Sequence, residues 1–314
     1  MLDKEQKPKK PSARLTEEEA KEIVEKFKKE KQVLLPEYFS LPGEGKETKR
    51  EFSKETVLAY WLKKILEEIK LEMENEFLIR NAEGMLKIKI ESGQKPGNTL
   101  DAWESILGYV SFKQSGLWSK ADQEFQKWAE ENIENQQLIE NAKEKLKIQI
   151  KSSQELEKML EAQEVISFYV SFKQSGLWSK VDQEFQKWAE ENIENQQLIE
   201  NAKQWLKSEI GFGQEPQMAI TLNAGNAILG YVSFKQSGLW SKVDQEFQKW
   251  AEENIENQQL IENAKEILKS DVKSGLKLGE TVSAWNAILD YNYIFQFQKL
   301  LEERGSKKDV LKES

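Results

Sequence analysis

The acidic side chains are the first residues of this chain that could do chemistry, because two nearby carboxyl groups can act as acid and base. The chain has 314 residues with 55 Asp and Glu, and it contains no Cys and no His. This composition excludes thiolate metal sites and every Ser-His-Asp or Cys-His arrangement. No carboxyl pair stands out, since the acids recur in every repeat and fit the charge pattern of a helix surface. EF-hand loops, HExxH motifs and phosphate-binding loops are absent. We therefore expect no catalytic residues, no metal and no cofactor.

A repeated segment of 35 residues carries six of these acids in each of its copies. It occurs at 109–143, 169–203 and 231–265, and the copies differ only at Ala121, Val181 and Val243. Folding alone would let the solvent-facing residues of such copies diverge. Either the duplication is recent, which we favour, or the same surface is used several times.

Asparagines in the middle of each copy are the first candidate binding residues. On a helical wheel they share the side of Phe and Trp, where a buried amide needs hydrogen-bond partners. An amide ladder could hold an extended peptide. The alternatives, which we favour, are a polar layer that sets the helix register or a stretch where the helix becomes exposed. The candidates are Asn132, Asn135, Asn192, Asn195, Asn254 and Asn257.

Tryptophans at repeat spacing are the second candidates. Trp118, Trp178 and Trp240 each precede a long helical segment, and a row of them could anchor a partner. The alternative, which we favour, is that each ring folds under the adjoining helix. Three further tryptophans fall on the apolar stripe and are expected in the core: Trp128, Trp188 and Trp250.

Two helices per unit must position these side chains. No Gly or Pro interrupts residues 119–150, and the apolar positions form one stripe, which predicts a single helix of about 30 residues. Ser119 and its equivalents are its expected N-caps, with Asp122 three residues later. A shorter helix is expected to begin near Thr99, Thr221 or Thr281 and to end at the Ser-Gly of KQSGLW, where Gly can adopt a left-handed conformation.

The period of these helices predicts the architecture. Phe52, Phe112, Phe172 and Phe234 begin successive units, 60, 60 and 62 residues apart. We expect an all-α, solenoid-like array of αα-hairpins of about 60 residues, each with a long and a shorter helix. The repeat domain is expected to span 52–314. Its units lie near 52–111, 112–171, 172–233 and 234–293, with a truncated end at 294–314.

The segments before and after the complete units are less regular. Residues 1–14 are polar and basic, which predicts a disordered arm. Residues 15–51 predict a capping helix that starts with the Thr16 and Glu19 capping box, followed by an extended Pro- and Gly-rich connection. A terminal helix is expected from Ile294 to about Glu303, before Gly305.

Part of each unit resembles the tetratricopeptide repeat, a helix-turn-helix unit with a Trp, a Leu-Gly pair, an aromatic residue and a turn glycine. The matching residues are Trp103, Leu107, Gly108, Phe112, Gly116, Ala121 and Phe125. The resemblance covers about half of each unit. It implies a protein-interaction solenoid that binds a peptide or partner on its concave side.

Charge narrows the choice of partner. The net charge is −9, and each repeated block is itself acidic, which disfavours nucleic-acid binding. No apolar run approaches the roughly 20 residues of a membrane span, so we expect a soluble, cytoplasmic protein. We expect a non-enzymatic scaffold that binds a protein or peptide partner, which includes a second copy of itself. The alternatives are a self-assembling filament or lattice and, last, an enzyme using the unique segment 212–224.

Overall fold

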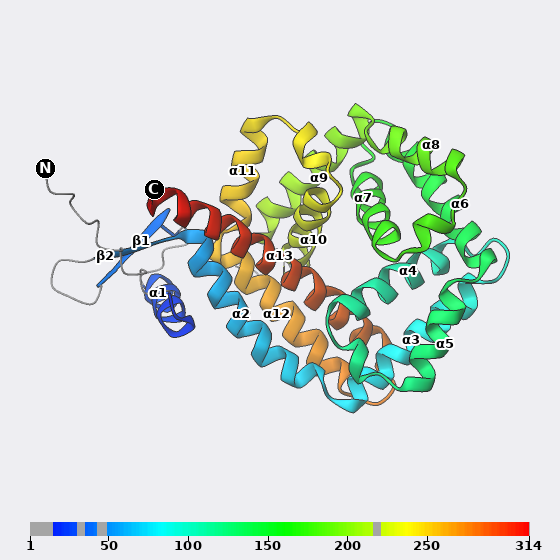
Figure 1. Cartoon of the computed structure of the whole chain (residues 1–314), viewed down its shortest axis with the longest axis horizontal. Coiled ribbons are helices and arrows are strands. Elements are labelled where there is room, and N and C mark those ends of the chain that lie inside the picture. The colour runs from blue at the N-terminus through cyan, green and yellow to red at the C-terminus, as the bar shows by residue number, and fades with distance from the viewer. Residues whose placement is uncertain (1–14, 30–34, 43–48, 216–220, 314) are drawn as a thin grey trace, which may run out of the picture. The chain divides into compact units, whose positions relative to one another are not determined.

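The computed structural model describes residues 15–29, 35–42, 49–215 and 221–313 (Figure 1). They form two compact units. One joins the described residues up to 64 with those from 298 onward, and the other spans 65–297. The described chain is almost entirely helical, which confirms the all-α class, and its strands form one two-stranded sheet. The basic arm predicted at 1–14 lies outside the described residues.

Within residues 65–297, a pair of antiparallel helices occurs four times (Figure 1). The outer helices are α3 (Glu76–Gly93), α6 (Gln136–Ser153), α9 (Gln196–Gly213) and α12 (Gln258–Gly275). The inner helices are α4 (Thr99–Gln114), α7 (Met159–Gln174), α10 (Thr221–Gln236) and the first part of α13 (Thr281–Glu313). Each of α4, α7 and α10 packs against the outer helix of its own hairpin and against the next outer helix.

Short helices connect successive hairpins. Helix α2 (Lys54–Met73) precedes α3. Three 3₁₀ turns follow inner helices: η1 (Trp118–Lys120), η2 (Leu177–Lys180) and η4 (Leu239–Lys242). Each turn leads to one short α-helix: α5 (Gln123–Ile133), α8 (Gln183–Ile193) or α11 (Gln245–Ile255).

One asparagine in each outer helix ties that helix to the preceding hairpin. The Nδ2 atom of Asn141 donates to the carbonyl oxygens of Gly93 (2.8 Å) and Lys95 (2.7 Å). Asn201 and Asn263 make the equivalent pairs of bonds. We call these three residues, together with the equivalent Asn81 of α3, the latch asparagines.

The first latch asparagine bonds to the last hairpin. Asn81 donates to the carbonyl oxygens of Gly275 (2.9 Å) and Lys277 (2.8 Å), and α12 packs against α3. The four hairpins therefore form a closed ring. The rotation from one hairpin to the next sets the curvature of a repeat protein, and here it returns to its start after four steps.

The expected single helix of about 30 residues is wrong, because the chain turns between α5 and α6. Asn135 has extended backbone angles (φ −58°, ψ 129°), and its side chain accepts from the amides of Gln137 and Leu138. It is therefore the N-cap of α6. The apolar stripe still looks continuous on a helical wheel, because α5 and α6 each bury apolar residues that keep the same spacing.

The N-caps of α5, α8 and α11 also differ from expectation. Asp122 accepts from the amide of Phe125, and Asp182 and Asp244 do the same in their copies. The serine predicted as the cap, Ser119, instead donates to the carbonyl oxygen of Gly116. Gly116 has a φ of +75°, which confirms the left-handed end of the shorter helix.

The second unit contains α1 (Glu17–Lys29), β1 (Tyr38–Pro42) and β2 (Lys49–Ser53). The capping box is confirmed, since Thr16 and Glu19 each accept from the other's amide. The two strands pair antiparallel with Phe39 opposite Phe52, so part of the expected extended connection forms a sheet.

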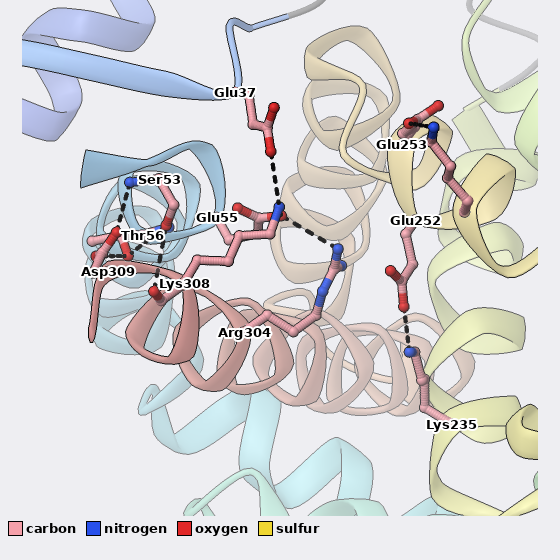
Figure 2. A network of polar contacts seen from close by, with 12 residues as sticks. Glu37, Ser53, Glu55, Thr56, Lys235, Glu252, Glu253, Arg304, Lys308 and Asp309 are labelled. Atoms are coloured by element: carbon pink, nitrogen blue, oxygen red, sulfur yellow. Dashed lines mark hydrogen bonds and ion pairs between the residues drawn. The ribbon is translucent and has the colours of Figure 1, made fainter. Parts of the chain in front are cut away.

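Charged groups join the start of α2 to the end of α13 (Figure 2). Glu55 is 1% exposed and accepts from Lys308 at 2.7 Å and from Arg304 at 3.3 Å. Burial alone would raise the pKa of Glu55, but these two cations lower it overall. A buried carboxylate is stable here because it is paired.

The same end of α13 caps α2. The Asp309 carboxylate accepts from the Ser53 amide (2.8 Å) and the Thr56 hydroxyl (2.7 Å), where a negative charge suits the positive end of a helix. At Gly305, an added Cβ would lie 2.6 Å from the Thr56 nitrogen. Helix α13 continues through Gly305 to Glu313. The separate helix expected from Ile294 to Glu303 is therefore part of α13. None of the helices in the described ranges is long and apolar enough to cross a membrane.

Candidate functional site

The tryptophans predicted as possible anchors are buried within their own units. The Trp118 ring meets Tyr109 and Phe112 edge-on, with centroids 5.3 and 5.4 Å apart, and Lys113 lies over it. Trp178 and Trp240 have equivalent neighbours, and the three side chains are at most 9% exposed. Packing against their own helices accounts for these residues.

The tryptophans expected in the core lie closer to the surface. The side chains are half-buried in all three copies, Trp128, Trp188 and Trp250. Each belongs to a short helix that packs against the previous outer helix. A lysine of that outer helix covers each ring, with Lys87 Nζ lying 5.3 Å from the Trp128 centroid. The alkyl part of a lysine can shield an aromatic face while its charge stays in water.

The predicted asparagines act at the breaks between helices. Asn135, Asn195 and Asn257 cap α6, α9 and α12. In the other set, the carbonyl and side-chain oxygens of Asn132 accept from Gln94 of the preceding hairpin, and Asn192 and Asn254 accept from Gln154 and Gln214. In the structure, the polar groups of these six asparagines are used within the protein itself.

A chain of carboxamides links the C-terminal ends of the inner helices. Asn292 donates to Gln114 (3.2 Å), Gln114 to Gln174 (2.9 Å), Gln174 to Gln236 (3.2 Å) and Gln236 to Gln296 (3.5 Å). The chain starts and ends on α13. It shows that equivalent residues of the inner helices meet at one level around a common axis, so these helices are parallel and in register.

The first turns of the inner helices form the opposite end of this bundle. Of the twelve large apolar side chains that the described residues expose, seven lie in these turns or in the segments leading into them, and an eighth, Phe212, lies in the last turn of α9. We call these eight the apolar rim: Leu100, Leu156, Met159, Leu160, Phe212, Leu222, Leu278 and Val282.

One rim residue from each inner helix lies on the face that points to the axis. Leu100 precedes Gln114 by fourteen residues, about four helical turns, so the two side chains share a face. Leu160, Leu222 and Val282 are its equivalents, and all four are 54–61% exposed. Midway along the same face, Leu107 is still partly exposed, whereas Ser111 is buried. Exposure on this face therefore decreases from Leu100 through Leu107 to Ser111.

Polar groups just below the rim join each outer helix to its inner helix. In the first hairpin, Lys89 pairs with Asp101 (2.8 Å) and Glu104 (2.5 Å). In the third hairpin the acid lies on the outer helix instead. Glu209, at the position of Lys89, accepts from Asn223 (3.2 Å) and Asn226 (3.1 Å), which stand at the positions of the two acids of the first hairpin. We call these positions the acidic belt. Its members are Lys89, Asp101 and Glu104; Gln149, Glu161 and Glu164; Glu209, Asn223 and Asn226; Asp271, Ser283 and Asn286.

Several carboxyl groups at this level are poorly solvated. Burial raises the pKa of Glu209 and Asp271. Burial, together with the charge of Asp271, raises the pKa of Asp290 to about 7. Tyr293, one turn further along α13, is half-buried, and its desolvation together with the nearby Asp290 raises its pKa. Asp271 and Asp290 hydrogen-bond to one another, so one of them keeps its proton near neutral pH.

Sequence reasoning missed both the rim and the belt. It concentrated on the identical segments, whereas these residues lie in the diverged parts of each unit. A signal was present: the side chains at the belt positions change from one hairpin to the next, while each hairpin stays acidic. Asp290 also stands where two other inner helices have glycines, Gly108 and Gly230.

Neither the family models, nor the curated proteins, nor the solved structures include a match to this chain. In the described part of the chain, no group of three or more acidic side chains is arranged to hold a metal ion.

Proposed function

We propose that this chain is a non-enzymatic protein-interaction module that binds a partner protein at the apolar rim. The observation that carries the proposal is the concentration of exposed apolar side chains at one end of the ring. Large exposed apolar patches on a folded protein are typical of sites where another molecule docks.

The rim offers repeated, equivalent contacts. Leu100, Leu160, Leu222 and Val282 occupy the same position in four hairpins. Burying one such side chain stabilises a complex by roughly 1.5–3 kcal/mol. Several of them acting together give a strength that no single contact has. The tetratricopeptide-like pattern, where it holds, also favours a protein-binding role.

Removing the rim side chains tests the proposal. The test variant is Leu100→Ser, Leu160→Ser and Leu222→Ser combined, and the control is Ile88→Ser with Ile148→Ser, which are 56% and 52% exposed on outer helices. Proteins that co-purify from the native host with wild type and control should be lost with the rim variant. Unchanged recovery by a rim variant with wild-type circular dichroism would contradict the proposal.

Self-association through the same rim is the second candidate. It is favoured by the arrangement of equivalent aliphatic side chains around one axis, which two copies could present to each other. Sedimentation equilibrium distinguishes the two, since a rim-dependent dimer supports self-association. A wild-type monomer at high concentration rules it out and leaves the binding of another protein.

A further inference from the structure

We propose that the segment bound at the apolar rim carries a cationic group, either a Lys or Arg side chain or a free amino terminus, that enters the bundle toward the acidic belt. This inference rests on the proposed function, because it names the chemistry of the partner that the rim receives. It is carried by the charges of the belt, by the partial burial of Glu209 and Asp271, and by an unpaired acceptor on α7, Gln163 Oε1.

Each hairpin contributes one net negative charge to the belt. In the first hairpin, Lys89 offsets one of the two carboxylates, Asp101 and Glu104. In the second, Lys158 pairs with Glu161 at 3.1 Å, which leaves Glu164. The third and fourth hairpins contribute one acid each from the outer helix, Glu209 and Asp271. Different residues thus give the same charge four times.

Further charged groups lie at the margin of the belt. The positive charge of Lys95 lowers the pKa of Asp101, and that of Lys145 opposes the rise in the pKa of Glu164 that burial causes. The Lys145 ammonium also lies 5.7 Å from the Trp103 ring centroid. These two lysines reduce the four negative charges to two. Asp290 adds negative charge when it ionises. The level below the rim therefore stays acidic in a protein whose net charge is already −9.

No cationic side chain among the described residues pairs with the third and fourth belt carboxylates. Amide groups satisfy Glu209, through Asn223 and Asn226, and Asp271 is bonded to another acid, Asp290. A buried carboxylate without a cation is costly, and an incoming positive charge offsets that cost. Burial raises the pKa of each of these acids, which shows that water solvates their charged forms poorly.

A buried acceptor on the same inner helix as Glu164 lacks a donor. Gln163 is 2% exposed, its Nε2 atom donates to Ser167, and its Oε1 atom has no hydrogen-bond partner. Ser167 lies on the axis-facing side of α7, at the position of Leu107 in α4. An ammonium or guanidinium group has the several N–H donors that such an oxygen and the belt carboxylates require.

Charge complementarity therefore selects one occupant for the rim. An apolar segment with an acidic group would place like charges together, and a purely apolar one would bury the belt without compensation. Aliphatic side chains of the segment would cover the rim residues. Its cationic group would be attracted by the negative charges of Glu164, Glu209 and Asp271.

Three labelled peptides test the inference by fluorescence anisotropy. They share the same leucines and differ at one central residue, which is Lys, Glu or norleucine. The lysine peptide should bind wild-type protein at least about tenfold more tightly than the glutamate peptide, since a charge contact at 4 Å is worth from about 1 to 4 kcal/mol. Raising the salt concentration should reduce this preference.

Matched variants locate the preference. Glu164→Gln, Glu209→Gln and Asp271→Asn combined should bring the lysine and glutamate affinities within about twofold of each other. The control, Glu124→Gln, Glu184→Gln and Glu246→Gln, removes the same charge from exposed first turns of α5, α8 and α11 and should keep the preference. If the belt variant does not fold, Glu164→Gln alone, at an exposed side chain, should reduce the preference.

The outcomes separate the two proposals. If all three peptides bind equally and the rim variant abolishes binding, the cationic group is excluded and the rim remains a binding site. If no peptide binds, or if the rim variant binds as wild type does, the proposed function itself is contradicted.

Discussion

Asn81 donates hydrogen bonds to the carbonyl oxygen of Gly275, 194 residues further along the chain, and to that of Lys277. Asn141 makes the same two bonds to Gly93 and Lys95, between adjacent hairpins. The bonds of Asn81 thus give the first hairpin the neighbour that an open array would not provide. Closure brings four equivalent first turns around one axis, and this arrangement creates the apolar rim.

The latch asparagines give the first prediction. Asn81→Ala should destabilise the protein about as much as Asn201→Ala, because each leaves two loop carbonyl groups without donors. A buried unpaired group costs roughly 1–3 kcal/mol. Urea unfolding followed by circular dichroism measures both variants. In an open array Asn81 would have no preceding loop to bond, so a neutral Asn81→Ala beside a costly Asn201→Ala would refute closure.

A contact between inner helices gives the second prediction. At Gly108, an added Cβ would lie 1.6 Å from Cη2 of Trp285, whereas nothing lies within 4 Å of one at Gly211. Gly108→Ala should therefore destabilise the protein by about 1–3 kcal/mol through overpacking. Gly211→Ala, in α9, should stabilise it by up to about 1 kcal/mol through helix propensity. Thermal unfolding of both variants tests this, and equal shifts would show that Trp285 does not pack on α4.

Local features of the fold could be predicted from the sequence, because nearby residues determine them. The capping box of Thr16 and Glu19 and the left-handed Gly116 depend only on their neighbours. A helical wheel could not reveal the break at Asn135, because the buried apolar stripe keeps its phase across the turn. Closure was not predictable either, since it depends on small angles between hairpins that contacts such as Gly108 with Trp285 set.

The candidate site could be predicted even less. The rim residues read as ordinary apolar positions of a helix, and only closure shows that four of them surround one axis. The carboxylates of the belt looked like surface charges because their neighbours on the other helix of the hairpin were unknown. Partial burial of Glu209 and Asp271 comes from those neighbours.

The carboxyl pair on α12 and α13 gives the third prediction. Asp290 has a pKa of about 7 in the folded protein, far above the value of about 4 for an unfolded Asp. The folded state therefore holds more protons than the unfolded state between these values. The stability that this proton provides is present at low pH and is lost as the pH rises toward 7.

Asp290→Asn removes this dependence and serves as the reference. Between pH 5 and pH 8, the Tm of Asp290→Asn should rise relative to that of wild type. This range covers most of the interval between the unfolded pKa of about 4 and the folded pKa of about 7. Asp271 and Tyr293 face Asp290 and stay in place in both proteins. A Tm difference that does not change with pH would show that Asp290 is ionised throughout.

The fourth prediction concerns the pH dependence of peptide binding. A cationic group binds the ionised belt better than the protonated one, so the affinity for the lysine peptide should rise between pH 6 and pH 8, on either side of the Asp290 value of about 7. The norleucine peptide should show no such rise. Fluorescence anisotropy at both pH values measures this, and parallel changes for the two peptides would exclude a role for Asp290.

Site-specific cross-linking tests the central claim, binding at the rim, most directly. A photoreactive benzoylphenylalanine replaces either Leu160, in the rim, or Ile88, on an outer helix, and these positions are 54% and 56% exposed. Irradiation with the lysine peptide should give a covalent adduct from position 160 and none from position 88. Equal adducts from the two positions, or an adduct from position 88 alone, would contradict the claim.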